Sequence, residues 1–267
     1  MRALLVQLDI AWENRDENHR RVRGLLADVA PKPGDLIVLP EMFDSGFSLN
    51  IERTADEDGR SRAFLASLAR ERESYVYAGI TLRRPDGMGL NRAIILTPSG
   101  ETACEYDKLH PFSFGREPER FAPGERGVVT CLWESDGESL TLCPAVCYDL
   151  RFPELFRVGL GKGAEAFVIG ANWPSGRDRH WRTLLEARAI ENQAFVLAVN
   201  RVGKDPHLAY TGGSAAFSPT GERLTKANAN EPQMQRVVVV GVDPSAVRSW
   251  RTTFPACRDR RVDLVPD

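Results

Sequence analysis

Residues 140–160 read LTLCPAVCYDLRFPELFRVGL, and this stretch decides the fold class. Residues 140–146 form an apolar run of strand length, whereas residues 153–160 have the apolar spacing of a helix. The turn between them begins at Cys147, and Pro153 suits the first turn of the helix that follows. A strand that passes directly into a helix favours an α/β protein with parallel strand pairing.

The same alternation continues on both sides of this stretch, with antiparallel hairpins in the middle of the chain. Turn sequences such as Pro-Asp-Gly at 85–87 and Ser-Asp-Gly at 135–137 mark the hairpins. Helices are expected near residues 22–29, 64–68, 153–160 and 180–190, with a short helix before the C-terminus. Strands are expected over residues 3–8, 36–39, 75–82, 91–97, 101–106, 128–133, 140–146, 166–169, 195–199, 213–217 and 236–242.

These elements predict an α/β fold, built as a four-layer α-β-β-α sandwich with two mixed sheets. A single open sheet of about twelve strands would be strained by its own twist, so two sheets packed face to face are favoured. No Gly-, Ser- or Pro-rich linker divides the chain. We therefore expect a single domain over residues 1–267.

The composition excludes several classes of protein. The 267 residues carry 35 Lys and Arg against 37 Asp and Glu, a net charge of -2 that argues against a dedicated nucleic-acid or membrane-surface protein. No run approaches the roughly 20 apolar residues of a membrane span, and the N-terminus lacks the apolar region of a signal peptide. The five cysteines form no C-x-x-C pair, so a disulfide framework and structural zinc are not expected. We expect a reduced, cytoplasmic protein.

Three reactive side chains follow directly after apolar strands: Glu41, Lys108 and Cys147. In α/β sheets, sites form in crevices beyond the carboxyl ends of strands, so the fold could bring these three together. Each also has an ordinary structural interpretation, because a cysteine at a strand end is often buried, a glutamate solvated and a lysine exposed. Asp149 and Arg151, close to Cys147, could equally form an ion pair that braces the turn.

The turn at Cys147 would expose a nucleophile and point the next backbone N–H, that of Tyr148, at a substrate oxygen. Glu41 is flanked by apolar residues, and desolvation there would raise its pKa toward that of a useful general base. A thiol beside such a base is an arrangement that suits nucleophilic catalysis.

Three segments in this order resemble the nitrilase superfamily of carbon–nitrogen hydrolases. They are residues 39–41 (LPE), 106–112 (YDKLHPF) and 147–154 (CYDLRFPE), and residues 171–174 (ANWP) and 187–193 (ARAIENQ) are also similar to the family. The resemblance runs from the first strand to about residue 242 and implies the α-β-β-α sandwich. It also implies paired subunits, so we expect a homodimer or higher homo-oligomer, with the C-terminal tail from about residue 251 packing on a partner subunit.

The family's Glu-Lys-Cys triad maps onto Glu41, Lys108 and Cys147. The resemblance implies that Cys147 attacks an amide carbonyl, that Glu41 carries the proton to the leaving amine, and that a thioester is then hydrolysed. Lys108 and the backbone N–H of Tyr148 would stabilise the oxyanion, and Lys108 would favour the thiolate. No metal or organic cofactor is expected.

A second family glutamate follows the lysine in a Gly-Glu context, which is altered here to GREPE at residues 115–119. The altered spacing leaves two candidates. We expect Glu117 to be the fourth catalytic residue, orienting Lys108 or assisting the hydrolytic water, and Glu119 is the competitor.

The residues after the cysteine point to amides instead of nitriles. True nitrilases usually carry Cys-Trp-Glu, whereas this chain has Cys-Tyr-Asp at residues 147–149. Residues 41–48 (EMFDSGFS) and 171–174 resemble the ω-amidase branch, which hydrolyses 2-oxoglutaramate and 2-oxosuccinamate. The resemblance thus favours a small ω-amide as the substrate, with an aliphatic amide, an N-carbamoyl amide or a nitrile as alternatives.

A 2-oxo carboxylate at the far end of the substrate needs a cation, and arginine binds carboxylates in a bidentate manner. Pairing within the protein is, however, the commoner role of any single arginine. Phe43 and Trp173 are expected to wall the pocket, although as core residues they would look the same in sequence. The candidate carboxylate-binding residues are Arg116, Arg151 and Arg177.

Two other classes of enzyme, a cysteine–histidine hydrolase and a metal-dependent phosphoesterase, stay open at this stage, and a noncatalytic binding protein is disfavoured. A cysteine–histidine hydrolase could use His110 or His180 as its base. A noncatalytic binding protein on this fold would be expected to lack one of the three key residues, and all three are present. A phosphoesterase on the same architecture would need a metal site, although the four histidines form no H-x-H or H-E-x-x-H motif. Its candidate ligands are Asp9, Glu41, Asn172 and His180.

Overall fold

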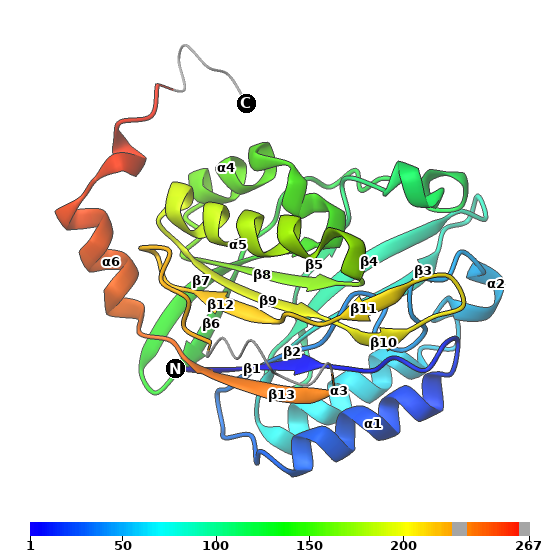
Figure 1. The fold of residues 1–267 in the computed structure, drawn as a ribbon. Helices are drawn as coiled ribbons and strands as arrows, with labels where there is room; N and C mark the ends of the chain where they lie inside the picture. Colours follow the sequence, from blue (N-terminus) through cyan, green and yellow to red (C-terminus); the bar gives the residue numbers. More distant parts are fainter. Residues whose placement is uncertain (226–233, 262–267) are drawn as a thin grey trace.

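The structure is a computed structural model that describes residues 1–225 and 234–261. Two large mixed sheets pack face to face, and helices cover the outer face of each sheet (Figure 1). The predicted α/β fold, an α-β-β-α sandwich with two mixed sheets, is therefore confirmed.

The first sheet consists of β1 (Arg2–Gln7), β2 (Leu36–Val38), β3 (Tyr75–Arg83), β4 (Gly89–Leu96), β5 (Thr102–Asp107) and β13 (Arg236–Gly241). Their order across the sheet is β13-β1-β2-β3-β4-β5. β1, β2 and β3 run parallel, whereas β13, β4 and β5 pair antiparallel with their neighbours. Parallel strands need long crossover connections, which explains why helices separate the three central strands along the chain.

The second sheet consists of β6 (Cys131–Ser135), β7 (Glu138–Val146), β8 (Ala166–Ala171), β9 (Phe195–Asn200) and β12 (Ala215–Phe217). Their order is β12-β9-β8-β7-β6, with β7, β8 and β9 parallel and the two outer strands antiparallel. Because β7 and β8 are parallel neighbours, the residues that follow them, Cys147 and Asn172, lie at the same edge of the sheet.

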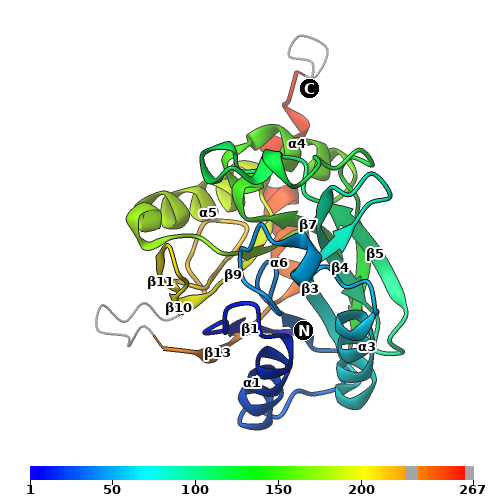
Figure 2. The same ribbon diagram turned by 90° about the vertical axis from the view of Figure 1, so that its right-hand side faces the viewer.

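The helices are α1 (Arg15–Ala27), α2 (Ile51–Thr54), α3 (Arg60–Arg72), α4 (Pro153–Gly161), α5 (Asp178–Asn192) and α6 (Pro244–Thr253). α1 and α3 lie on the outer face of the first sheet, and α4 and α5 lie on that of the second (Figures 1 and 2). Short 3₁₀ helices occupy the loops: η1 (Ser113–Gly115), η2 (Glu117–Glu119), η3 (Cys147–Arg151), η4 (Ser175–Arg177) and η5 (Ala256–Arg258).

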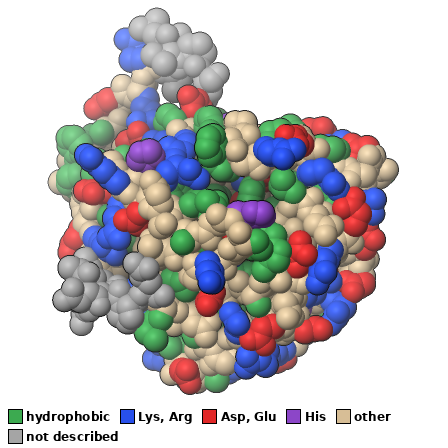
Figure 3. Space-filling view, turned by 45° about the vertical axis from the view of Figure 1, so that its right-hand side comes forward, with side chains coloured by type: hydrophobic (Ala, Val, Ile, Leu, Met, Phe, Trp, Pro, Cys, Tyr) green, Lys and Arg blue, Asp and Glu red, His purple; other side chains and the backbone are tan. Residues whose placement is uncertain are grey.

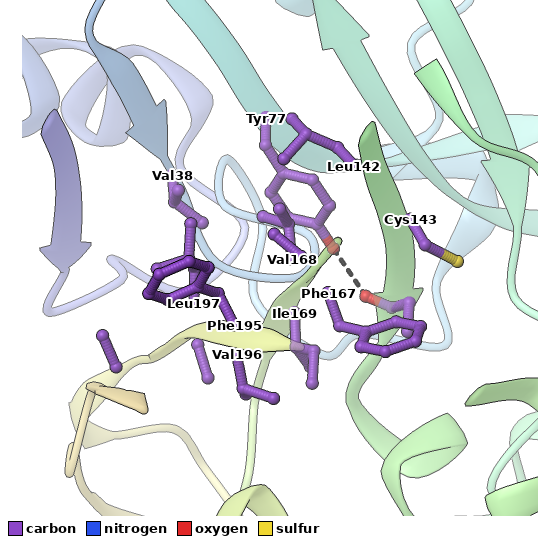
Figure 4. Packing of buried hydrophobic residues seen from close by; sticks show 14 of the residues in the cluster. Val38, Tyr77, Leu142, Cys143, Phe167, Val168, Ile169, Phe195, Val196 and Leu197 are labelled. Carbon is purple, nitrogen blue, oxygen red and sulfur yellow. Dashed lines mark hydrogen bonds between the residues drawn. The ribbon is translucent and has the colours of Figure 1, made fainter. Parts of the chain in front are cut away.

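The core between the sheets is apolar, but one tyrosine joins the two sheets through hydrogen bonds. Tyr77 on β3 donates its hydroxyl proton to Ala145 O on β7 over 2.8 Å (Figure 4) and accepts from the Gly170 N–H on β8 over 3.0 Å. Buried side chains from both sheets, including Val38 and Leu142, belong to the same core cluster as Tyr77. A buried hydroxyl with both of its bonds made fixes the position of one sheet on the other.

The sequence patterns missed the shortest elements. β10 (Val202–Lys204) and β11 (Ala209–Thr211) form a separate two-stranded sheet, which is too short to show an alternating pattern. The strand expected from residue 128 begins only at Cys131. The apolar side chain of Val128 packs into the core, but its backbone lies outside the strand.

The described part of the C-terminal tail packs on its own chain. Arg251 donates to the carbonyl oxygens of Ala164 and Asn192 at 2.7 and 3.2 Å, at the ends of α4 and α5. Residues 262–267 lie outside the described residues, and packing of the tail on a partner stays a prediction. Within residues 1–225 and 234–261, no helix is long and apolar enough to cross a membrane.

Candidate active site

Glu41 lies in the turn after β2, between the two sheets. Gly79 on β3 and Gly170 on β8 make room for this turn. A Cβ atom on Gly79 would lie 2.7 Å from Glu41 Cα, and one on Gly170 would lie 3.0 Å from Glu41 N. Any side chain at either position would therefore push the turn away. The close approach of the two strands to this turn explains why the Glu41 side chain, although charged, is 0% exposed.

Both oxygens of the buried Glu41 carboxylate have partners. Oε1 accepts from Lys108 Nζ at 2.9 Å and from Asn91 Nδ2 at 2.7 Å. Oε2 accepts from the backbone N–H of Asn172 at 2.9 Å. The side-chain amide of Asn172 also donates to the carbonyl oxygen of Glu41 at 2.6 Å. Bonds to both oxygens and to the backbone hold the carboxylate in one orientation.

Lys108 follows β5, and its ammonium group lies between two carboxylates. Nζ is 2.8 Å from Glu117 Oε2 and 2.9 Å from Glu41 Oε1. Asn91 Nδ2 also bridges the two acids, with distances of 2.7 Å to Glu41 Oε1 and 2.9 Å to Glu117 Oε1. An ammonium group has three protons, so two carboxylates leave one N–H for the cavity that Lys108 lines.

The two candidate glutamates lie in different surroundings, although both belong to η2. Glu117 is 0% exposed, bonds to Lys108, and accepts from the backbone N–H of Phe112 at 2.6 Å. The side chain of Glu119 is 54% exposed and pairs with Arg116 at 2.7 Å. The fold thus brings Glu117, and not Glu119, to the lysine.

Cys147 begins η3 at the end of β7, and its φ of 46° lies in the left-handed region. That conformation costs a residue with a side chain about 1–3 kcal/mol, so the surrounding structure must hold it. Part of that support comes from α5, where Arg188 donates to Leu150 O at 2.9 and 3.1 Å. The chain turns sharply here from strand to helix, as the sequence predicted, and Cys147 lines the cavity.

The alternative of an ion pair between Asp149 and Arg151 is not found, because Asp149 uses both oxygens for other partners. Oδ2 accepts from the Tyr106 hydroxyl at 2.7 Å and from the Val146 N–H at 3.0 Å. Oδ1 accepts from the backbone N–H of His110 at 3.1 Å and lies 2.8 Å from its Nδ1. Asp149 therefore ties together the ends of β5 and β7, the strands that present the lysine and the cysteine.

Mutual charge interactions set the protonation of this cluster. Burial would raise the pKa of Glu41, but the Lys108 charge and the hydrogen bonds outweigh it and lower that pKa. Burial would lower the pKa of Lys108, yet the charges of Glu117 and Glu41 raise it. Burial and the Glu41 charge raise the pKa of the Cys147 thiol well above its usual range, although Lys108 opposes this. The resting thiol is thus neutral, and the expected rise in the pKa of Glu41 is wrong.

A cavity of about 570 Å³ opens beside the cysteine and the lysine. Figure 3 shows hydrophobic side chains gathered around a hollow on one face of the molecule, with Lys, Arg and His side chains close by. Five of the predicted binding residues line the cavity, namely Arg116, Tyr148, Arg151, Trp173 and Arg177. Further aromatic and apolar lining comes from Trp12, Phe47, Phe112, Phe114, Leu208 and Tyr210.

The arginines of this cavity have different partners. The guanidinium of Arg151 lies 4.8 Å from the ring centre of Trp173, and that of Arg177 lies 5.2 Å from the ring centre of Phe112. Arg116 has a side chain that is 73% exposed and is already paired with its acidic neighbour. Stacking on an aromatic face orients a guanidinium and leaves its N–H groups able to bind an anion.

The expectation that Phe43 walls the pocket is wrong. Phe43 is 0% exposed and packs outside the first sheet, where its ring stacks 5.7 Å from His19 and 6.0 Å from Phe64. The tight turn after the glutamate sends this ring toward the outer helices. Phe47 lines the cavity instead, and its ring centre lies 5.6 Å from Lys108 Nζ.

Sequence reasoning missed the two asparagines that position the carboxylates. Asn91 lies inside β4, where asparagine is uncommon, and that departure was the available signal. Asn172 entered as part of the family segment at residues 171–174 and as a candidate metal ligand, but not as a partner of Glu41, although it follows a buried strand in the same way as Cys147. Its contacts are hydrogen bonds to Glu41.

The histidines of the alternative hydrolase have other partners. His110 contacts Asp149 and stacks on Phe152 at 3.7 Å, and His180 Nδ1 lies 3.2 Å from Arg151 Nη2. The charged groups that most affect the pKa of the Cys147 thiol, which burial and Glu41 raise, are Glu41, Lys108 and Glu117. In the part of the chain that the structure describes, no group of three or more His, Cys, Asp and Glu side chains could hold a metal ion.

Comparison with known proteins agrees with this geometry. The carbon-nitrogen hydrolase family model matches residues 2–252. The omega-amidase YafV of Yersinia enterocolitica is 34% identical over 97% of this chain and 96% of its own. The 2-oxoglutaramate amidase of Bacillus subtilis is 33% identical over 97% of each chain. A CN-hydrolase superfamily protein from Xanthomonas campestris, solved with an arsenic adduct in its active site, has a TM-score of 0.83 at 34% identity over 97% of both chains. This chain therefore belongs to the carbon–nitrogen hydrolases of the nitrilase superfamily.

Proposed function

We propose that this chain is an ω-amidase that releases ammonia from 2-oxoglutaramate or 2-oxosuccinamate through a thioester on Cys147. One observation carries the proposal: a single cavity is lined by Cys147 and Lys108 and also by the guanidinium of Arg151. Relatives named omega-amidase and 2-oxoglutaramate amidase support the same class of substrate.

In the first half of the cycle, the sulfur of Cys147 attacks the amide carbonyl while Glu41 takes the thiol proton. The neutral thiol and the low pKa of Glu41 suit this order, because the base is already ionised when the substrate arrives. The remaining N–H of Lys108 and the backbone N–H of Tyr148 stabilise the oxyanion. Each such donor is typically worth about 10²–10³ in rate.

The tetrahedral intermediate collapses when Glu41 returns the proton to the leaving nitrogen. The carbon–nitrogen bond breaks, ammonia departs, and the acyl group stays on Cys147 as a thioester. Water then attacks the thioester carbonyl while Glu41 accepts one of its protons. That proton finally returns to the sulfur, and the carboxylate product leaves.

Glu117 acts on Lys108 in this scheme and not on the substrate. Each half of the cycle converts Glu41 from a carboxylate to a carboxylic acid, which removes one of the two counterions of Lys108. Glu117 supplies the other at 2.8 Å, so the lysine stays charged while the oxyanion is present. Asn91 keeps the two acids at a fixed spacing because its amide bonds to both.

Arg151 is the proposed partner of the substrate carboxylate, with Arg177 on the same wall of the cavity. A hydrogen bond to a charged group contributes about 1.5–3 kcal/mol. Arg116 is the least suitable of the three, because the Glu119 carboxylate already occupies its guanidinium. Phe47 and Trp173 would then enclose the carbon chain of the substrate.

An ammonia-release assay over matched substrates tests this proposal. We expect the highest kcat/KM for 2-oxoglutaramate and 2-oxosuccinamate, at least about tenfold above a neutral amide of the same length. A preference for a nitrile or an N-carbamoyl compound would overturn the substrate class. Ammonia release by Cys147→Ala would overturn the mechanism, and Cys257→Ala, in the tail, serves as the matched control that stays active.

The proposal extends to the whole molecule: one domain over residues 1–267 that works in the cytoplasm as a homodimer, with the tail from about residue 251 against its partner. The family model supports the single domain, since it spans residues 2–252. Phe254 is 55% exposed in the tail, and an apolar side chain there suits contact with a second subunit. Light scattering on the full chain tests this, and a monomeric mass at micromolar concentration would contradict it.

A further inference from the structure

We propose that Cys104 and Cys131 form a reversible disulfide that joins the two sheets at one edge of the sandwich. Cys104 is on β5 and Cys131 is on β6, and their sulfur atoms lie 3.1 Å apart. The pair is separate from the cavity, so the inference does not depend on the proposed amidase activity.

The topology makes this a natural position for a covalent link. β5 is the last strand of the first sheet, β6 is the last strand of the second, and the two strands contact each other. Among the described residues, β5 pairs through its backbone with β4 and β6 pairs with β7, and no backbone pairing joins the two edges. A disulfide bond is about 2.05 Å long, so the two sulfurs need to approach by only about 1 Å.

Both thiols are also within reach of an oxidant. Cys104 and Cys131 are partly exposed, whereas Cys143, which lies nearby in the core, is buried. Cys257 is partly exposed as well, but its sulfur contacts the carbonyl oxygen of Asn192 at 3.6 Å. The chain thus offers a pair that can close, and a partly exposed single thiol for comparison.

The oxidant we name is a low-molecular-weight disulfide such as oxidised glutathione. The Cys131 thiolate attacks one of its sulfurs, the disulfide bond of glutathione breaks, and one glutathione thiolate leaves. The Cys104 thiolate then attacks the mixed disulfide, and the second glutathione leaves. Two protein thiols lose two electrons and two protons, and two molecules of reduced glutathione form. Cys104 donates its S–H to Cys131, and this hydrogen bond together with burial raises the pKa of Cys104. The first attack is therefore assigned to Cys131.

The disulfide would close a loop between residues that are 27 positions apart. This loop contains Lys108 and Glu117. The disulfide would therefore reduce the conformational freedom of the unfolded chain in a segment that carries two residues of the candidate active site. The sulfurs are nevertheless distant from the reacting atoms. Lys108 is four residues beyond Cys104, or about 14 Å along an extended strand, so the geometry around it is preserved.

The test uses the full-length protein in a series of reduced and oxidised glutathione buffers. Free thiols are alkylated at each ratio, and the protein is mapped by non-reducing peptide mass spectrometry. We expect one linked peptide pair, Cys104 with Cys131, that disappears after addition of dithiothreitol. The midpoint of thermal unfolding of the oxidised protein should rise by about 5–10 °C. Its turnover of an amide substrate should stay within about twofold of the reduced value.

Variants separate this site from general oxidation. Cys104→Ser should abolish the linked pair, and Cys257→Ser should retain it in full. The inference is overturned if both thiols stay free at the most oxidising ratio, if Cys131 stops at the mixed disulfide with glutathione, or if the bond joins two copies of the chain. The wild-type peptide map gives this answer even if a variant fails to fold, and it does so whether or not the chain is an amidase.

Discussion

The floor and the rim of the cavity hold their charged groups in different ways. The floor consists of Glu41, Asn91, Lys108 and Glu117, and the rim consists of Arg116, Arg151 and Arg177. In the floor, the side chains of the lysine and of the two acids are at most 1% exposed and bond to one another within 3.2 Å. In the rim, two guanidinium groups lie on aromatic faces at 4.8 and 5.2 Å, and the third is paired at the surface.

This difference separates the chemistry from the choice of substrate. A buried carboxylate or ammonium group is stable only with its partners in place, so a change in the floor disturbs every member. A stacked arginine at a surface keeps its position without a fixed acidic partner and can exchange water for a ligand anion. We therefore expect mutations in the floor to affect kcat and mutations in the rim to affect KM.

Glu41→Gln should have the largest effect. The amide cannot accept the thiol proton, and kcat for ammonia release should fall by at least about 10³-fold. Glu13→Gln is the matched control, since Glu13 also lines the cavity but accepts its hydrogen bond from Ser48. Steady-state kinetics and a thermal melt check both variants, and an active Glu41→Gln protein would refute the assignment of the base.

Glu117→Gln should lower kcat by about 10²–10³-fold with little change in KM, because it weakens the hold on the Lys108 charge. Glu119→Gln changes a neighbour in the same 3₁₀ helix that is exposed and pairs with Arg116 instead of Lys108. Its kcat should stay within about twofold of the wild-type value. Equal losses in the two variants would contradict the distinction between the buried and the exposed glutamate.

Arg151→Gln should raise KM for 2-oxosuccinamate by about 10–100-fold, the cost of one charged hydrogen-bonding partner. Its kcat/KM for a neutral amide should change little, since such a substrate carries no carboxylate. Arg116→Gln is the control at the rim, because the native guanidinium is already paired. A uniform loss across both substrates would show that Arg151 shapes the pocket instead of binding the anion.

Asp149→Asn should lower kcat by about tenfold. The asparagine amide cannot accept all four contacts that Asp149 makes at the ends of β5 and β7. Asp205→Asn is a matched control, because Asp205 accepts from Tyr210 and two backbone N–H groups at the outer loop of the cavity. Greater loss in Asp205→Asn would reverse the proposed importance of the two carboxylates.

The dependence of kcat/KM on pH should be the smallest effect. The pKa of Glu41 is lowered from 4.5, so its basic form persists as the pH falls toward that value. The pKa of Cys147 is raised well above 9.0, so no thiolate accumulates as the pH rises through neutrality. Between about pH 5 and pH 8 the rate should change less than twofold. A tenfold rise per pH unit would indicate a free thiolate as the nucleophile.

The parts of this site that the sequence predicts are those fixed by local structure. Glu41, Lys108 and Cys147 each follow the end of a strand, and parallel or neighbouring strand ends meet at one edge of a sandwich. The α-β-β-α fold followed from the same alternation of strands and helices. The fold required only patterns that extend over a few residues, whereas the triad is assigned from the resemblance to the nitrilase superfamily.

The parts that escaped prediction depend on turn geometry and on contacts distant in sequence. Glu117 and Glu119 are two residues apart, and although the sequence favours Glu117, it leaves Glu119 open because only the path of η2 decides which one faces the core. Phe43 leaves its expected place in the pocket wall, and Phe47 lines the cavity instead, because Met42 has a φ of 44°, which redirects the chain after the glutamate. No spacing in the sequence reports such a turn, since most residues with a side chain avoid it.

The central claim is that the buried floor activates Cys147 to carry the acyl group. Rapid-quench mass spectrometry during the first turnover of 2-oxosuccinamate tests this most directly. We predict that ammonia appears together with a mass increase equal to the acyl group, located on the peptide that contains Cys147. Ammonia released with the acyl group on another residue, or at the wild-type rate by Cys147→Ala, would contradict the account.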